Sequence, residues 1–261
     1  MRGPLNEYDS WRERLTRRFA PTSPREERGE VTPESRDKAM HYVWDFAILG
    51  KYSHLFWLGL GWTIAYTIGT VFLGTVIGLV VGILRLRRLP VIDWLLIAYI
   101  ELFRCTPLLV QIIWFYYAFP VVIGVNIPAH VAAVTVLSLY GGAFYAEIVR
   151  GSIESVNRGQ WDAAQALGLR PWRVLRLVIL PQALKPMLAP YVNQSVTQLK
   201  NTSLVSVIAV PDLVYNATLI NAETYRPLEV YTIVALIYFA ILFPATLVAR
   251  RLERGMTYDK A

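Results

Sequence analysis

Three long stretches of the chain carry no Asp, Glu, Lys or Arg: residues 52–84, 105–146 and 230–249. A helix needs about 20 apolar residues to cross the hydrocarbon core of a bilayer. A charged side chain at the centre of such a helix costs about 2.5–3.5 kcal/mol on insertion scales. The pattern therefore predicts membrane-spanning helices.

Polar and charged positions divide the chain into five predicted spans, so the expected fold class is an all-α membrane protein with five transmembrane helices. Pro107 is expected to bend the second span. The fourth span is the least apolar, and a loop is expected to join it to the fifth. Within a membrane domain at 55–255, the spans cover about 55–84, 91–119, 129–149, 187–209 and 230–249.

The ends of the chain differ from this domain. Residues 1–40 form a polar extension rich in both basic and acidic residues, in which Pro21, Pro24 and Pro33 interrupt any helix. Residues 41–54 contain several aromatic side chains and are predicted to lie at the membrane interface. Residues 256–261 are expected to form a short cytoplasmic tail.

Composition agrees with a membrane protein, since 55% of the residues are hydrophobic and only 17% are charged. Soluble domains average about 45–50% apolar and about 25% charged residues. Cys105 is the only cysteine, which excludes an intrachain disulfide framework. The net charge of +7 would suggest nucleic-acid binding only if the basic residues shared a soluble face.

The basic residues instead indicate membrane topology. Positively charged side chains gather in cytoplasmic loops, and here they follow the first, third and fifth spans, whereas the loops after the second and fourth hold only Arg226. We therefore expect a cytoplasmic C-terminus and an extracytoplasmic N-terminus. An alternative places residues 1–54 along the inner surface. The basic residues that set this topology are Arg85, Arg87, Arg88, Arg150, Arg158, Arg170, Arg173, Arg176, Lys185, Arg250, Arg251, Arg254 and Lys260.

The cytoplasmic loop at 150–185 has a helix–turn–helix pattern. Good helix formers at 162–167 precede Gly168, which suits a helix end, and Pro171 suits the first turn of a second helix. The first helix is expected to expose Ala163, Ala164 and Leu167, a small apolar face suited to a groove on another protein. Bends are expected at Pro181 and Pro186 as the chain re-enters the membrane.

Polar residues inside the spans have two interpretations. Those of the fourth span either join helices through hydrogen bonds or line a path for a polar substrate. The candidates for that path are Asn193, Thr197, Gln198 and Asn201, and Gln111 in the second span has the same two interpretations. Near the inner ends of the second and third spans, four charged residues are expected to form structural ion pairs or a gate: Glu101, Arg104, Glu147 and Arg150.

No metal site is predicted. The three histidines, His41, His54 and His130, lack the spacing of a ligand set.

The cytoplasmic loop resembles the EAA signature of ABC importer permeases, which reads E-A-A, three residues, G, nine residues and I-x-L-P. Asp162-Ala163-Ala164, Gly168 and Val178-Ile179-Leu180-Pro181 match it, with Asp162 for Glu and Val178 for Ile. Glu101 to Gln111 resembles the E-x-F-R-G-T-P-L-x-x-Q motif of the polar amino acid (histidine, glutamine, glutamate or arginine) branch, with Cys105 for Gly. Residues 146–151, 199–204 and 243–244 also fit, so the resemblance covers about 42–255.

This resemblance implies the type I (MetI-like) importer permease fold in a bacterial inner membrane. It implies that the 157–181 loop couples transport to a separate ATPase, which binds ATP and Mg, while this chain binds no cofactor and is no enzyme. The absence of a G-x-x-x-x-G-K-[ST] phosphate loop agrees with that division. It further implies a second permease, identical or different, and an extracytoplasmic amino acid binding protein. The implied coupling residues are Asp162, Ala163, Ala164, Leu167, Gly168 and Pro181.

Two other functions remain open at this point. The chain could be the partner permease of a heterodimeric importer, with a mainly structural and coupling role. A secondary transporter would also carry polar residues at membrane depth. It would however have more spans or internal repeats, and it would not need the loop signature.

Overall fold

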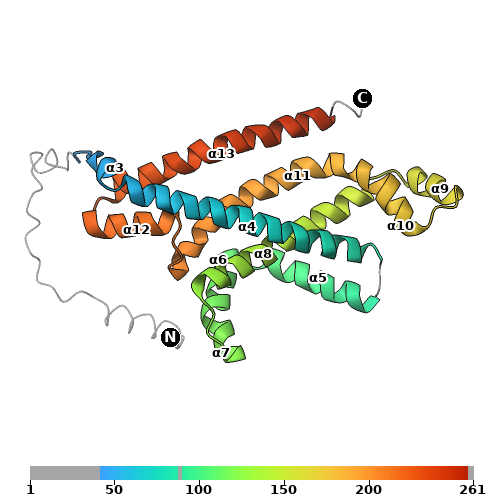
Figure 1. Cartoon of the computed structure of the whole chain (residues 1–261), viewed down its shortest axis with the longest axis horizontal. Helices are drawn as coiled ribbons and strands as arrows, with labels where there is room; N and C mark the ends of the chain where they lie inside the picture. Colours follow the sequence, from blue (N-terminus) through green and yellow to red (C-terminus); the bar gives the residue numbers. More distant parts are fainter. Residues whose placement is uncertain (1–41, 88–89, 258–261) are drawn as a thin grey trace, which may run out of the picture. The chain divides into compact units, whose positions relative to one another are not determined.

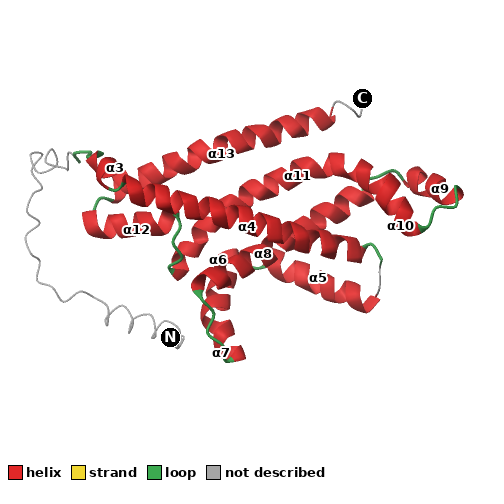
Figure 2. Ribbon diagram, in the orientation of Figure 1, coloured by secondary structure: helices red, strands yellow, loops and turns green. Residues whose placement is uncertain are grey.

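A computed structural model describes residues 42–87 and 90–257, and all regular elements in these ranges are helical (Figure 1; Figure 2). The 1–40 extension and residues 258–261 of the tail lie outside the described residues. Contacts divide the chain into Met1–Trp44 and Asp45–Ala261, and every described helix belongs to the second unit. The α-helices are α3 (Ala47–Lys51), α4 (Ser53–Arg85), α5 (Pro90–Cys105), α6 (Leu108–Ile113), α7 (Phe119–Ile123), α8 (Ala129–Glu154), α9 (Arg158–Ala166), α10 (Pro171–Arg173), α11 (Leu180–Asn201), α12 (Leu213–Thr224) and α13 (Pro227–Thr257).

Three helices are long and apolar enough to cross a membrane, namely α4, α8 and the Pro227–Arg251 part of α13. Two further pairs of helices are long and apolar enough when each pair is taken together, but each pair is bent at the break between its helices. The first joins α5 to the Leu108–Ile123 segment at 108°, and the second joins the Pro171–Ile208 helix to α12 at 46°. If each bent pair is one span, the described residues form five spans, as many as the sequence predicts.

Small residues allow α4 and α8 to pack closely, side by side and in the same direction. Gly74 faces Gly142, and Gly82 faces Val149 farther along both helices. Between these contacts, a Cβ atom added at Gly78 would lie 2.4 Å from the Cβ atom of Tyr145. This part of α4 therefore requires glycine for space, as small-xxx-small helix pairs in membranes do.

The bend predicted at Pro107 is confirmed. Helix α5 ends at Cys105, and Pro107 has extended backbone angles before α6 begins. The side-chain amide of Gln111 donates hydrogen bonds to the carbonyl oxygens of Phe103 and Thr106, both at 3.1 Å. Because a break exposes carbonyl groups that a bilayer cannot hydrate, Gln111 supplies the missing donor within the chain.

Pro181 and Pro186, where bends are predicted, both lie in continuous helical backbone, in which a proline can bend a helix without ending it. A π-helical segment, Val174–Ile179, continues directly into α11, and Pro181 lies in the first turn of that helix. Pro186 lies inside α11. A π-turn changes the local hydrogen-bond pattern and can accommodate a residue without an amide N–H, which explains why the helix is not interrupted.

The loop expected between the fourth and fifth spans contains a helix, α12. The preceding 3₁₀ segment, Thr202–Ile208, ends at Ala209 in a left-handed conformation with φ of 57°. Asp212 then caps α12 by accepting a hydrogen bond from the backbone N–H of Tyr215 at 2.7 Å. Three buried residues of α12 at helical spacing pack with residues of α3, α4 and α13: Leu213, Ala217 and Ile220.

Candidate functional site

Helix α9 forms the centre of the candidate coupling site, and both of its ends are capped. The Asn157 side chain accepts a hydrogen bond from the backbone N–H of Gly159 at 2.8 Å. At the other end, Gly168 has φ of +75° and its N–H donates to the carbonyl of Gln165 at 2.8 Å. The turn predicted at Gly168 is therefore confirmed, and glycine is preferred there because of this left-handed conformation.

Ala164 attaches α9 to the rest of the chain. It is 4% exposed and belongs to a core cluster with Val156, Val174 and Ile179, which come from the flanking segments. The prediction that Ala164 is exposed is therefore wrong. A methyl side chain at this position lets α9 lie directly on the start of the helix that becomes α11.

The opposite side of α9 is exposed. Asp162 and Ala163 are exposed, and the Leu167 side chain is 82% exposed. Pro181 is also exposed, in the first turn of α11. The amide of Gln182 donates to the side-chain oxygen of Gln160 at 3.3 Å, which joins α9 to α11 a second time. The exposed residues of α9 thus lie on a helix that is attached to the segments before and after it.

Glu147 of α8 is the centre of a charge cluster that joins the end of α4 to α5 and α8. Its carboxylate pairs with Arg85, lies 2.8 Å from Arg150 and 3.9 Å from Arg104. Three of the four predicted charged residues therefore come together. Glu101 has a different contact, because its carboxylate accepts a hydrogen bond from the Cys105 thiol.

Sequence reasoning missed Arg85 as a member of this cluster and assigned it only a role in topology. Arg85 also pairs with Asp93 at 3.3 Å, so it joins α4 to the start of α5 as well as to α8. A charge at the end of a long apolar stretch gives a topological signal, and nothing in the sequence marks it as an ion-pair partner.

The candidate path residues separate into two groups. Asn193 and Thr197 are exposed on α11 at a spacing of four residues, so they share one face. Gln198 is fully buried, and its amide donates to the carbonyl of Leu137 at 2.8 Å. Asn201 is partly buried at the end of α11.

Gln198 and Gln111 therefore both direct their amides toward carbonyls of the chain itself. Within this chain they join helices, whereas Asn193 and Thr197 are the path candidates that reach the surface.

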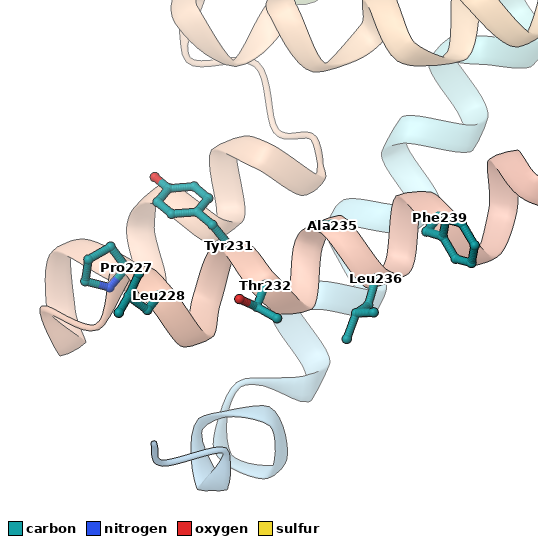
Figure 3. Close-up of a pocket in the computed structure, with 7 residues that line it drawn as sticks. All are labelled: Pro227, Leu228, Tyr231, Thr232, Ala235, Leu236 and Phe239. Atoms are coloured by element: carbon teal, nitrogen blue, oxygen red, sulfur yellow. The ribbon is translucent and has the colours of Figure 1, made fainter. Parts of the chain in front are cut away.

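A surface hollow of about 660 Å³ lies elsewhere, along α13 (Figure 3). All of its lining residues come from that one helix, and they are mainly apolar. It is therefore a stretch of exposed helix surface rather than a binding site for a polar substrate.

A family model described as "Binding-protein-dependent transport system inner membrane component" matches residues 74–258. The chain belongs to this family. The resemblance seen in the sequence is thereby confirmed, as is the expectation of a multi-pass inner-membrane permease subunit that is not itself catalytic. A binding-protein-dependent ABC system also implies an ATPase and a binding protein as partners.

Curated relatives include further permeases of this family. The chain is 37% identical over 196 residues to the probable amino-acid ABC transporter permease protein YckA of Bacillus subtilis (strain 168), which covers 75% of this chain and 86% of the relative. It is 39% identical over 184 residues to the glutamine transport system permease protein GlnP of Escherichia coli (strain K12), which covers 70% of this chain and 84% of the relative.

Solved structures share the fold of this family member. One, described as an amino acid ABC transporter with histidines, is 36% identical, has a TM-score of 0.76, and covers 82% of this chain and all of that chain. An inward-facing MetNI methionine ABC transporter has a TM-score of 0.62 at 23% identity, covering 77% and 98%. The expected MetI-like importer permease fold is thereby confirmed.

Proposed function

We infer that this chain is the permease subunit of an ATP-driven ABC importer for polar or charged amino acids, the class that includes the glutamine named for the Escherichia coli relative. The observation that carries this proposal is the position of α9. Ala164 packs this helix against the rest of the chain, while the neighbouring residues Asp162, Ala163 and Leu167 are exposed.

Coupling to the ATPase follows from this attachment. A separate subunit that binds ATP and Mg contacts the exposed face of α9. Gly168 forms the turn after this helix, and Pro181 lies at the start of α11. Because α9 packs on the segment leading into α11, a displacement of α9 is transmitted to the helix that carries Asn193 and Thr197. Packed helices transmit such movements because protein interiors are dense.

A second permease completes the path. The exposed amide of Asn193 is costly if it faces lipid, and Thr197 lies one turn along the same face, where its hydroxyl donates to the Asn193 carbonyl at 3.0 Å. In a pair of permeases they face a shared polar path instead, where they can bind the charged groups of an amino acid. Asn201 and Lys200 extend this path toward the end of α11.

The orientation follows from the basic residues. The 150–185 loop and the C-terminus are cytoplasmic, and the N-terminus is extracytoplasmic, where the binding protein delivers the amino acid. The Glu147 cluster then lies toward the cytoplasmic side, where it joins the end of α4 to α8 and to Arg104 in the last turn of α5. There it fixes the helices to one another, with movement of Arg104 or Arg150 as a gate being the second interpretation.

The test uses the complete transporter in vesicles with its ATPase and binding protein. We expect Ala163→Glu to abolish ATP-dependent uptake while the subunits still insert, because a charged, larger side chain replaces a small contact. The matched control, Ala163→Ser, keeps a small side chain and should retain uptake. Equal uptake by both variants would contradict the coupling role.

Substitution of the path residues distinguishes a substrate-binding permease from a structural partner. We expect Asn193→Ala and Thr197→Ala to raise the substrate concentration needed for half-maximal uptake. If each variant leaves both that concentration and the substrate preference unchanged, this chain has the structural role and its partner permease holds the substrate.

A further inference from the structure

A groove of about 390 Å³ lies between the end of α4 on one side and α9, α10 and the Val174–Ile179 segment on the other. Ile83, Leu86 and Leu175 form apolar walls, and Arg87 adds one charged side chain. Trp161 and Trp172 complete the lining, and the Trp172 side chain is 55% exposed. The groove thus combines apolar surface with a positive charge.

The arginines around this groove have no ion-pair partner among residues 42–87 and 90–257. Arg87 lines the groove, and Arg170 and Arg173 flank Pro171 and Trp172 in the sequence; all three are exposed. This contrasts with Arg85, only two residues before Arg87, which pairs with both Asp93 and Glu147. The positive charge at the groove is therefore available to an anionic ligand.

The position of the groove along α4 places it at the level of lipid headgroups. Helix α4 is a membrane-spanning helix that ends at Arg85, and Arg87 follows directly. Tryptophan is enriched at the membrane–water interface, and basic side chains are enriched on the cytoplasmic side. Trp172 and Arg87 together fit the boundary between the inner leaflet and the cytoplasm.

A second groove, of about 270 Å³, lies farther from the end of α4. It is lined mainly by apolar side chains, among them Leu79, Leu184 and Leu188. Leu79 lies one helical turn before Ile83 on α4, a rise of about 6 Å. On the other wall, Leu184 and Leu188 follow Leu175 along the helix that runs from α10 into α11 (Figure 1). Both grooves therefore lie along α4 and the helix that runs from α10 into α11, with α9 closing the first and α8 closing the second.

We propose that these two grooves bind one anionic phospholipid of the inner leaflet. Its phosphate group lies at Arg87, and one acyl chain lies along Leu79 and Leu188. The order of the linings, charged and then apolar toward the bilayer centre, is that of a phospholipid. An acidic segment of the ATPase would match the charge of the first groove, but it would have no reason to enter the apolar second groove. Basic pockets between helices on the cytoplasmic side are suited to anionic headgroups.

The test is native mass spectrometry of the purified permease–ATPase complex, titrated with phosphatidylglycerol or with phosphatidylcholine. We expect Arg87→Gln to weaken phosphatidylglycerol binding about fivefold, the effect of one basic residue near a membrane surface. Phosphatidylcholine binding should stay unchanged. Arg87 is exposed and makes no ion pair with another described residue, so the variant should fold normally.

The matched control is Arg250→Gln, which removes the same charge near the end of α13 and does not line either groove. It should bind phosphatidylglycerol as the unsubstituted complex does. Leu79→Trp, which fills the apolar groove from a partly exposed position, should weaken the binding of both lipids.

Three results would overturn the proposal. Unchanged phosphatidylglycerol binding in Arg87→Gln would exclude a headgroup site at this arginine. Loss of the ATPase from that variant, with lipid binding intact, would assign the groove to the ATPase. Equal competition by glycerol 3-phosphate and phosphatidylglycerol would show a site for a free phosphate that does not use the apolar groove.

Discussion

The contact between α4 and α8 allows a quantitative test of the fold, because one helix offers both a crowded and an open glycine. A Cβ atom at Gly78 would lie 2.4 Å from that of Tyr145 and 2.9 Å from the backbone nitrogen of Ala146, whereas ordinary contact begins at 3.4 Å. Gly69, on the same helix, has no such neighbour within 4 Å. Gly78→Ala and Gly69→Ala therefore form a matched pair.

Helix propensity and packing change the free energy of unfolding in opposite directions when alanine replaces glycine. Alanine in place of glycine favours a helix by about 0.5–1 kcal/mol. Overpacking a dense contact costs about 1–3 kcal/mol, because the helices must separate by about 1 Å at Gly78. We therefore expect Gly78→Ala to lower the free energy of unfolding by about 0.5–2 kcal/mol and Gly69→Ala to maintain or raise it.

Thermal unfolding of the detergent-solubilised protein measures this difference. For a chain of this size, 1 kcal/mol shifts the unfolding midpoint by about 2–4 °C, so Gly78→Ala should unfold measurably earlier than Gly69→Ala. Midpoints that shift equally in the two variants would refute the direct helix contact. An upward shift in Gly78→Ala would do the same.

Three further substitutions test the candidate site. Gly168→Ala should cost about 1–2 kcal/mol through its left-handed backbone alone, and faster proteolysis after α9 would reveal it; equal resistance to protease would contradict this. Ala164→Glu should lower the yield of folded protein, because it buries a carboxylate in an apolar cluster, and a normal thermal midpoint would show that Ala164 does not anchor α9. Glu147→Gln should destabilise the protein by about 1–3 kcal/mol, since it removes the counter-charge of three arginines. A double-mutant cycle with Arg85→Met that finds no coupling would exclude their ion pair.

Long charge-free stretches and proline positions made much of the fold predictable. The spans follow from the cost of charge in a bilayer, and the bend follows from the ring of Pro107. The turn after α9 follows from Gly168, because few other residues adopt a left-handed conformation at low cost. Each of these features depends on local chemistry that a sequence displays directly.

The remaining features depend on which neighbours a residue meets. Ala164 and Ala163 are chemically identical, and only the packing of α9 decides which one is buried. Gln198 has the same side chain whether it lines a path or donates to Leu137. Helix α12 had a readable signal, the Asp212 cap followed by Leu213, Ala217 and Ile220, but the charged residues around it favoured a loop.

The short connections on either side of α9 limit how this region can vary among relatives. Only residues 155–157 separate α8 from α9, and only residues 167–170 separate α9 from α10. An inserted residue in either connection would rotate α9 and turn a different side chain toward the position of Ala164. Gaps in an alignment of relatives should therefore be absent from 155–170, while the exposed connection between α7 and α8, at 124–128, can change length freely.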